Sequence, residues 1–288
     1  MPLFTRHDGS LVRGESPMRR IMPYLMPSRN GSIVLHDSVF RIADTRGWLK
    51  AYNRAHAEHA TLFHLLAYAV AQTLHARPEL NRFVSGGRLY QRRGVQVSFV
   101  VKKEMKDDGQ STTVKLEVAP GERFAAYAAR LAGAIRDAQD TERAVDRETA
   151  LIMRFPGPIV RGLVGVARVL DRWNLFPRFM TASDPMFASL FLANLGSAGI
   201  SDAYHHLFEY GTVSVFGAVS APCRMPFVEG DTVAVRPGLR VRWSFDERIH
   251  DAFYGARSLD LVRRLLESPL THLGAAEGDP AFRWPEAR

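Results

Sequence analysis

Apolar and polar positions along this chain follow two periods, one typical of strands and the other of helices. Strands are predicted where β-branched and aromatic residues alternate or run together. These segments are 31–44, 87–104 with a turn at Arg93-Gly94, 111–118, 186–196, 211–222, and a broken pair of strands over 232–247. The number of such segments predicts a sizeable sheet.

Helices are predicted where apolar residues recur every three or four positions. These segments are 45–60, 62–76 capped by Thr61 and stopped at Arg77-Pro78, 122–144, and 255–268 ending at Pro269. The last of them places Leu259, Val262, Leu265 and Leu266 on one face. Because helices and strands alternate irregularly, we expect an α+β fold in which helices cover a mixed sheet.

The segment 151–180 combines arginines with an apolar face. Arg154, Arg161 and Arg168 stand seven residues apart, and apolar side chains recur at helical spacing from Pro158 onward. The favoured interpretation is a surface helix with its apolar side in the core. The alternative is a basic amphipathic helix over 154–172 that lies on a membrane surface or covers an acyl-chain pocket.

Composition and charge exclude several classes of protein. The 288 residues are 46% hydrophobic and 24% charged, which argues against disorder. The net charge of +8 is spread along the chain without a nucleic-acid-binding signature, so no nucleic-acid partner is predicted. There is no signal peptide and no run of 18 uncharged apolar residues, and the single cysteine, Cys223, indicates a reducing compartment. A cytoplasmic protein is therefore expected.

A family resemblance lies in "PFVEGDTVAVRPGLRVRWSFDERIHDAFYGARSLDLVRRLLESP", residues 226–269. This segment resembles the end of the catalytic domain of the acyltransferase components of 2-oxo acid dehydrogenase complexes. The family pattern "V-x-G-x-x-V-V-R-P-x-x-x-x-x-x-S-x-D-H-R-V-x-D-G-A" is matched without a gap, and so is the helix ending "L-L-E-x-P". The segments "MRRIMPYLMPSR", "FHLLAYAVAQTLHARPELNRFV" and "FLANLGSAGI" agree with other family motifs in the same order.

The resemblance implies a domain organisation. Residues 18–270 would form the acyltransferase-like domain, with a helical insertion at about 145–185 that lies outside the family pattern. Residues 1–17 would be an N-terminal arm and 271–288 a C-terminal tail. With no lipoyl segment in view, the chain resembles a free-standing, divergent member.

The resemblance also implies a fold and a reaction. The fold is that of chloramphenicol acetyltransferase, a mixed β-sheet covered by helices, assembled as a homotrimer with active sites between subunits. A histidine takes the proton of a thiol, the thiolate attacks an acyl thioester, and a hydroxyl group stabilises the oxyanion while an aspartate holds the local structure. No tightly bound cofactor is expected, and a coenzyme A thioester is the implied co-substrate.

The chain departs from the family at the catalytic positions. Glu247 stands where the family has its histidine, and Asp251 matches the family aspartate. Ala193 stands at the hydroxyl position before Asn194, so Ser197 is the nearest hydroxyl. A carboxylate is a weaker base toward a thiol than imidazole, by about 2 pKa units. The substrate-binding candidates are Asn194, Ser197 and Arg248.

Three histidines are alternative candidates for the catalytic base. Reading "HDAFYG" as the wider "H-x-x-x-D-G" signature of the fold makes His250 the base, at the cost of a three-residue shift. His205 and His206 lie in "YHHLFEYGT" (204–212), where, if this were a strand, they would point to opposite faces. Either could be a new acid–base group or a structural histidine. They lack a nearby set of metal ligands, so no metal site is predicted.

Two functions follow. The first is a thioester-dependent acyltransferase with an altered base and an unknown acceptor. The second is a catalytically silent trimeric scaffold or ligand-binding protein that kept the fold. The retained polar residues favour the enzyme, while Glu247, Ala193 and Ala252 favour the scaffold.

Overall fold

The alternating segments of the sequence form one mixed seven-stranded sheet in the computed structural model, which describes residues 6–103, 109, 111–140 and 149–283. The order is β2-β10-β8-β7-β5-β6, and β9 pairs with β10. The β5–β7 and β7–β8 pairs are parallel and the others antiparallel. The strands are β2 Ile33–Arg41, β5 Val95–Lys102, β6 Ser111–Val118, β7 Leu190–Asn194, β8 Val215–Val219, β9 Cys223–Glu229 and β10 Thr232–Asp246.

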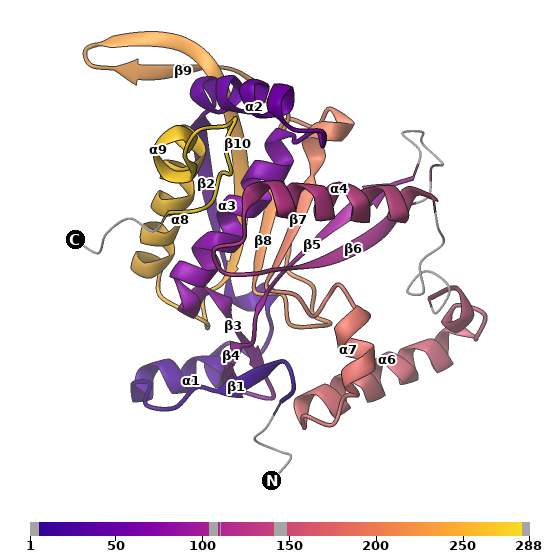
Figure 1. The fold of residues 1–288 in the computed structure, drawn as a ribbon. Helices are drawn as coiled ribbons and strands as arrows, with labels where there is room; N and C mark the ends of the chain where they lie inside the picture. Colours follow the sequence, from indigo (N-terminus) through magenta and orange to yellow (C-terminus); the bar gives the residue numbers. More distant parts are fainter. Residues whose placement is uncertain (1–5, 104–108, 110, 141–148, 284–288) are drawn as a thin grey trace.

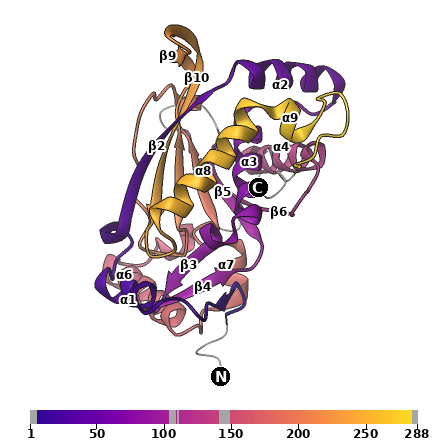
Figure 2. The ribbon, with the colours of Figure 1, turned by 90° about the vertical axis from the view of Figure 1, so that its left-hand side faces the viewer.

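Helices cover one face of this sheet (Figures 1 and 2). They are α2 Ala43–Ala55, α3 Leu62–Ala76, α4 Phe124–Asp140, α8 Ala252–Glu267 and α9 Pro269–Leu273. α3 is apolar all round and lies in the middle of the layer, so eleven of its residues are buried. The indole of Trp243 on β10 is buried beneath the helices, and its Nε1–H donates to Ser38 Oγ.

The predicted helices are present, but the one predicted over 45–60 ends at Ala55, and residues 56–60 are not helical. Thr61 is the N-cap of α3, and its backbone N–H donates to His64 Nδ1. α8 begins at Ala252, three residues before the predicted start, because Asp251 caps it. The predicted face of α8, with Leu259, Val262, Leu265 and Leu266, is buried. The predicted end of α4, residues 141–144, lies outside the described residues.

A second, three-stranded sheet of order β1-β4-β3 lies at one end of the molecule (Figure 1). Its strands are β1 Gly9–Leu11, β3 Arg82–Ser85 and β4 Arg88–Arg92. Helix α1, Pro17–Leu25, lies beside it, and short 3-10 turns span Asn30–Ser32 (η2), Pro78–Asn81 (η3) and Leu195–Ala198 (η4). β1 belongs to the predicted N-terminal arm and buried Phe282 to the predicted tail, so described parts of both segments pack against the rest.

The predicted break over 232–247 is wrong, because β10 is one continuous strand. Pro237 faces Arg224 on β9, and its carbonyl accepts a hydrogen bond from Ile42 N–H. The pairing with β2 begins at the next residue, Gly238. Proline is tolerated here because β10 changes partners at this position and needs no ladder donor.

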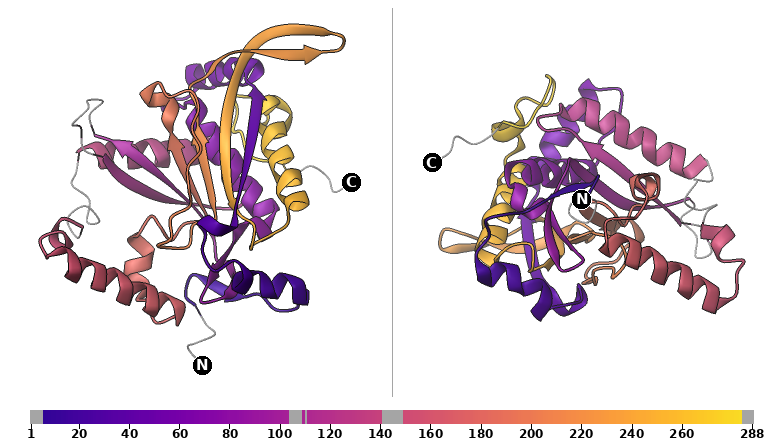
Figure 3. Two further views of the ribbon diagram at one scale, coloured as in Figure 1. Left: turned by 180° about the vertical axis from the view of Figure 1, so that it is seen from behind. Right: turned by 90° about the horizontal axis from the view of Figure 1, so that it is seen from below.

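The favoured interpretation of the arginine-rich segment is also wrong. α6, Gly157–Arg172, is the predicted amphipathic helix, but it buries none of its residues. It lies at the edge of the molecule, away from the large sheet (Figures 1 and 3), whereas the short α7, Arg178–Ser183, is tied to β6 because Lys115 Nζ donates to the carbonyl of Thr181. Side chains on the apolar face of α6 are 46–57% exposed, namely Ile159, Leu163, Val166, Val169 and, beyond its end, Trp173. No helix within the described ranges is long and apolar enough to cross a bilayer.

Candidate functional site

Glu247 lies in the turn between β10 and α8, where the sequence places the family histidine. Its backbone N–H donates to Ser32 O at 2.9 Å, and its carbonyl accepts from Arg19 Nη1 at 3.1 Å. Its side chain is half-buried. The residue is therefore held at the backbone while its carboxylate lines a surface depression.

A buried ion pair flanks Glu247 on both sides. Arg248 Nε and Nη2 donate to the two carboxylate oxygens of Asp246 at 2.8 and 2.7 Å. The side chains are 4% and 0% exposed, and Ser32 Oγ and the backbone N–H of Arg248 also donate to Asp246. Arg248 Nη1 donates to Met26 O, which ties the turn to the end of α1. Arg248, a predicted substrate-binding residue, is thus engaged in fixing the turn.

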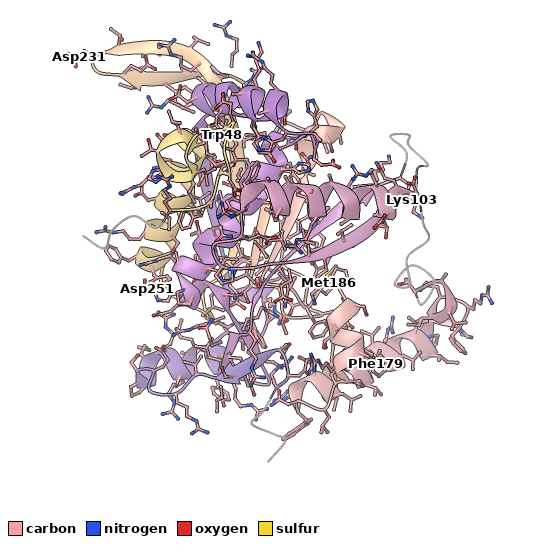
Figure 4. All side chains as sticks on the ribbon, in the orientation of Figure 1. Trp48, Lys103, Phe179, Met186, Asp231 and Asp251 are labelled. Atoms are coloured by element: carbon pink, nitrogen blue, oxygen red, sulfur yellow. The ribbon has the colours of Figure 1, made fainter. Side chains whose placement is uncertain are left out.

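Asp251 is the N-cap of α8 (Figure 4). Its Oδ1 accepts from Tyr254 N–H at 2.9 Å, and Arg19 Nη2 lies 3.7 Å from its Oδ2. The hydrogen bond from the Tyr254 backbone lowers the pKa of this exposed carboxyl. A capping carboxylate fixes the start of the helix, which is the structural role that the resemblance implies for the family aspartate.

Both ring nitrogens of His250 face carboxylates. Its Nε2 lies 2.8 Å from Glu79 Oε2, and its Nδ1 lies 3.4 Å from Asp251 Oδ1. The ring also packs on Tyr254, with 3.9 Å between centroids. A general base needs a nitrogen free for the substrate, so this geometry favours a structural role for His250 over the shifted alternative.

Glu247, His250 and Asp251 share two depressions. One is a cavity of about 90 Å³ that Leu80 and Leu259 also line. The other is a groove of about 320 Å³ beneath α1, where Arg19 and Met22 contribute. The structure therefore brings these three predicted site residues together in front of a space that could hold a substrate.

Asn194 and Ser197 do not line either of the depressions that Glu247 lines. Asn194 ends β7, and Ser197 Oγ donates to the Asn194 carbonyl at 2.7 Å within the same turn. Ala193 faces Ala218, which faces Arg242, so these three residues form one row across the sheet. Glu247 comes five residues beyond Arg242, a separation of about 16 Å along the strands and about 10 Å across them. Within one subunit, the hydroxyl position and the base position cannot act on one reacting group.

The histidine pair lies in a loop, which corrects the assumption that 204–212 is a strand. The two adjacent rings stack on each other, with 4.6 Å between centroids, instead of pointing to opposite faces. His205 also stacks on Phe216 of β8, and its carbonyl accepts from Ser244 Oγ. The loop thus covers the face of the sheet opposite the helices, where Phe191, Leu207 and Phe216 form a second apolar cluster.

Gly211 lets this loop approach the chain before β7. Its φ is +84°, and a side chain there would collide with the backbone of Met186. His205 is half-buried and His206 exposed, and neither lines a cavity with Glu247. Among residues 6–103, 109, 111–140 and 149–283, no group of three or more His, Cys, Asp or Glu residues could hold a metal ion.

Sequence reasoning missed three residues that hold the site. Arg19 binds the Glu247 carbonyl, Glu79 binds His250, and Ser32 binds Asp246. Each partner lies more than 170 residues away in the chain. Arg19 and Glu79 carried a signal, because each falls in a segment that resembles a family motif, whereas Ser32 carried none.

No protein-family model and no curated protein matches the chain. Solved structures match along about nine-tenths of it, and they show the mixed-sheet fold of chloramphenicol acetyltransferase and of the 2-oxo acid dehydrogenase acyltransferase cores. The sequence identity is low, so the chain is a divergent example of that fold.

Three of these structures illustrate the match. The cubic core of a pyruvate dehydrogenase multienzyme complex has a TM-score of 0.60 and 17% identity, over 90% of this chain and 93% of that one. A probable dihydrolipoamide acetyltransferase from Listeria monocytogenes 4b F2365 has a TM-score of 0.59 and 13% identity, over 89% and 94%. A chloramphenicol acetyltransferase has a TM-score of 0.54 and 12% identity, over 90% and 99%.

Proposed function

We propose that this protein is an acyltransferase that moves an acyl group from coenzyme A or another thioester to an amine or alcohol acceptor. The observation that carries the proposal is the placement of Glu247. Its carboxylate lines a groove at the position of the family base, in a turn held by the buried Asp246–Arg248 pair.

The proposed reaction uses Glu247 as a general base. Its carboxylate takes the proton of the acceptor while the acceptor nitrogen or oxygen attacks the thioester carbonyl. The tetrahedral intermediate then expels the thiolate, which takes up a proton. Asp251 and Arg248 act as positioning residues, because both hold the turn that carries Glu247.

We further propose a homotrimer with the active site between subunits. The support is the separation of the two groups of candidate residues. Glu247 lies beyond the end of β10, whereas Ala193, Asn194 and the nearby Ser197 lie several residues further along the sheet. A site that uses both groups needs the second group from a neighbouring copy. The predicted limits of the domain, residues 18–270, remain part of this proposal.

Acyl transfer is tested with a panel of acyl-coenzyme A donors and amine, alcohol and thiol acceptors, by following release of the coenzyme A thiol. We expect turnover with at least one amine or alcohol and little with dihydrolipoamide. Activity should fall in Glu247→Ala, because the carboxylate is the proposed base. Absence of both turnover and coenzyme A binding would overturn the proposal.

The scaffold alternative rests on the alanines at the hydroxyl and glycine positions of the family motif, Ala193 and Ala252. Neither side chain can donate a hydrogen bond to an oxyanion. The same panel separates the alternatives. Binding of coenzyme A without turnover would indicate a ligand-binding protein of this fold, and turnover would exclude a silent scaffold.

For α6 we propose contact with an anionic membrane surface. Ile159, Leu163, Val166 and Val169 on its apolar face are exposed, and Arg161 lies on the opposite face. A helix with this division lies in the plane of the interface, where basic side chains reach lipid phosphates.

The protein should sediment with vesicles of phosphatidylcholine and phosphatidylglycerol, and weakly with phosphatidylcholine alone. Leu163→Asp/Val166→Asp should abolish sedimentation without loss of stability, because both side chains are exposed. Val233→Asp on the β9–β10 hairpin, also an exposed valine, is the control and should bind like the wild type. If the double variant instead changes only the oligomeric state, the face is covered by a second copy and the membrane proposal is wrong.

A further inference from the structure

A cavity of about 370 Å³ that Glu247 does not line is rich in arginine side chains. The cavity lies between the end of α1, the β3–β4 turn, the last turns of α6 and the loop over 209–211. Arg29, Arg168, Arg172 and Arg248 line it, together with the carboxylates of Asp171 and Glu209. Its volume suits a small molecule or a polar headgroup.

The end of α6 is held firmly against this cavity although the rest of the helix is exposed. Asp171 pairs with the buried Arg6 at 2.8 Å and accepts from Ser85 Oγ at 2.8 Å. The carbonyl of Arg172 accepts from Arg88 Nη2 at 2.8 Å. Gly86, with φ of +58°, lets the two segments meet, because a side chain there would collide with the Arg172 carbonyl. These hydrogen bonds and this ion pair therefore hold Arg168 and Arg172 over the cavity.

The carboxylates around the cavity already have hydrogen-bond or ion-pair partners. Asp171 is held by Arg6 and Ser85, and Asp246 by Arg248. The two oxygens of Glu209 accept from the backbone N–H groups of Arg29 and Asn30, and one also accepts from Asn30 Nδ2. In the part of the chain that the structure describes, none of these carboxylates forms an ion pair with Arg168 or Arg172.

Arg29 is a second feature that favours an anionic ligand. It is 6% exposed and lines the cavity, yet its guanidinium donates only to neutral carbonyls, those of Val84, Phe208 and Glu209, at 3.2–3.3 Å. Its Nε–H has no hydrogen-bond partner among the described residues. Burial lowers the pKa of this side chain below its ordinary value. The carboxylates of Asp246, Asp171 and Glu209 act on this guanidinium only through space, so an anion in the cavity that accepts its hydrogen bonds would stabilise it further.

We propose that this cavity binds a phosphate group carried by a soluble small molecule or by a lipid headgroup. Guanidinium groups suit phosphate because their planar donors match its oxygens in pairs. Arg168 and Arg172, four residues apart on α6, close over the phosphate from one side, while Arg29 meets it from the body of the protein. The site does not depend on the proposed acyl transfer, since Glu247 does not line it.

The test is isothermal titration calorimetry of the full chain with inorganic pyrophosphate at about 0.15 M salt, where long-range attraction is screened. We expect saturable binding that weakens roughly a hundredfold in Arg168→Ala/Arg172→Ala, since each replacement removes a charge-assisted contact. The matched control is Arg154→Ala/Arg161→Ala, which removes the same charge from the same exposed segment without touching the cavity. This control should bind pyrophosphate within about twofold of the wild type.

Short-chain phosphatidic acid, dissolved as a monomer, distinguishes the two sources. If it displaces pyrophosphate and binds more tightly, the site takes a lipid headgroup, and if it binds more weakly, the site takes a soluble phosphate compound. Equal weakening by the two arginine pairs would show general electrostatic attraction and overturn the proposal. Absence of saturable binding of either probe to the wild type would do the same. Neither result bears on acyl transfer, which is measured separately.

Discussion

Replacing Arg248 by methionine should lower the free energy of unfolding by about 3–5 kcal/mol, because it leaves the buried carboxylate of Asp246 without its charged partner. That carboxylate is 0% exposed and would keep only Ser32 Oγ and one backbone N–H as donors. Methionine fills a similar volume, so the loss reports on the charge. Urea unfolding followed by circular dichroism measures it.

The control for this prediction lies on the neighbouring hairpin. Arg236 binds Glu229 with the same two-pronged geometry, at 3.0 and 2.8 Å, but the side chains are 50% and 32% exposed. Arg236→Met should therefore change stability by no more than about 1 kcal/mol. The double variant Asp246→Asn/Arg248→Met should recover part of the loss, since no unpaired charge remains. Equal effects of Arg248→Met and Arg236→Met would contradict the assignment of a buried pair.

Replacing Glu247 by glutamine should lower kcat/KM for acyl transfer by about 10²–10⁴, the usual contribution of a positioned general base. Glutamine keeps the shape of the side chain but cannot take a proton. Glu247→Ala should show a similar loss, and added formate should restore part of the rate by entering the vacated space. Rescue by a small carboxylate would not be expected of a residue that only supports the fold.

For His250 we expect the opposite result, that replacement leaves most of the activity. Because both of its ring nitrogens face carboxylates, His250→Gln should retain activity within about tenfold, and added imidazole should have no effect. The reverse pattern would show that the shifted alignment is correct. In that case His250→Ala would lose activity and recover it with imidazole, while Glu247→Gln would remain active.

The strands and helices were predicted best where one face of a segment is buried throughout. β6 and α8 show this, because their periodicity reflects contact with the same core along the whole segment. β10 was misread at Pro237, since local rules treat proline as a break and cannot know that the strand changes partners there. The short strands β1 and β3 were missed, because three or four residues carry too little pattern.

The candidate site was predicted in part. The match over 226–269 placed Glu247 and Asp251 in one turn, and the structure brings them together with His250. The same match could not show that Arg248 is engaged with Asp246, or that His250 is held by Glu79. These contacts depend on side-chain directions and on segments distant in the chain.

The sequence by itself determined the class of fold, the amphipathic character of α6 and the exchange of histidine for glutamate at position 247. Each of these is a property of one continuous segment, so periodicity or a gap-free motif can report it. The tertiary structure alone decided which faces are covered and which charges meet. In the tertiary structure the apolar face of α6 is exposed, and Arg29 is buried among carbonyl groups. Arg168 and Arg172 lie over the same cavity as Arg29. Burial and charge pairing arise between segments far apart in the chain, and no local pattern records which segment will lie opposite.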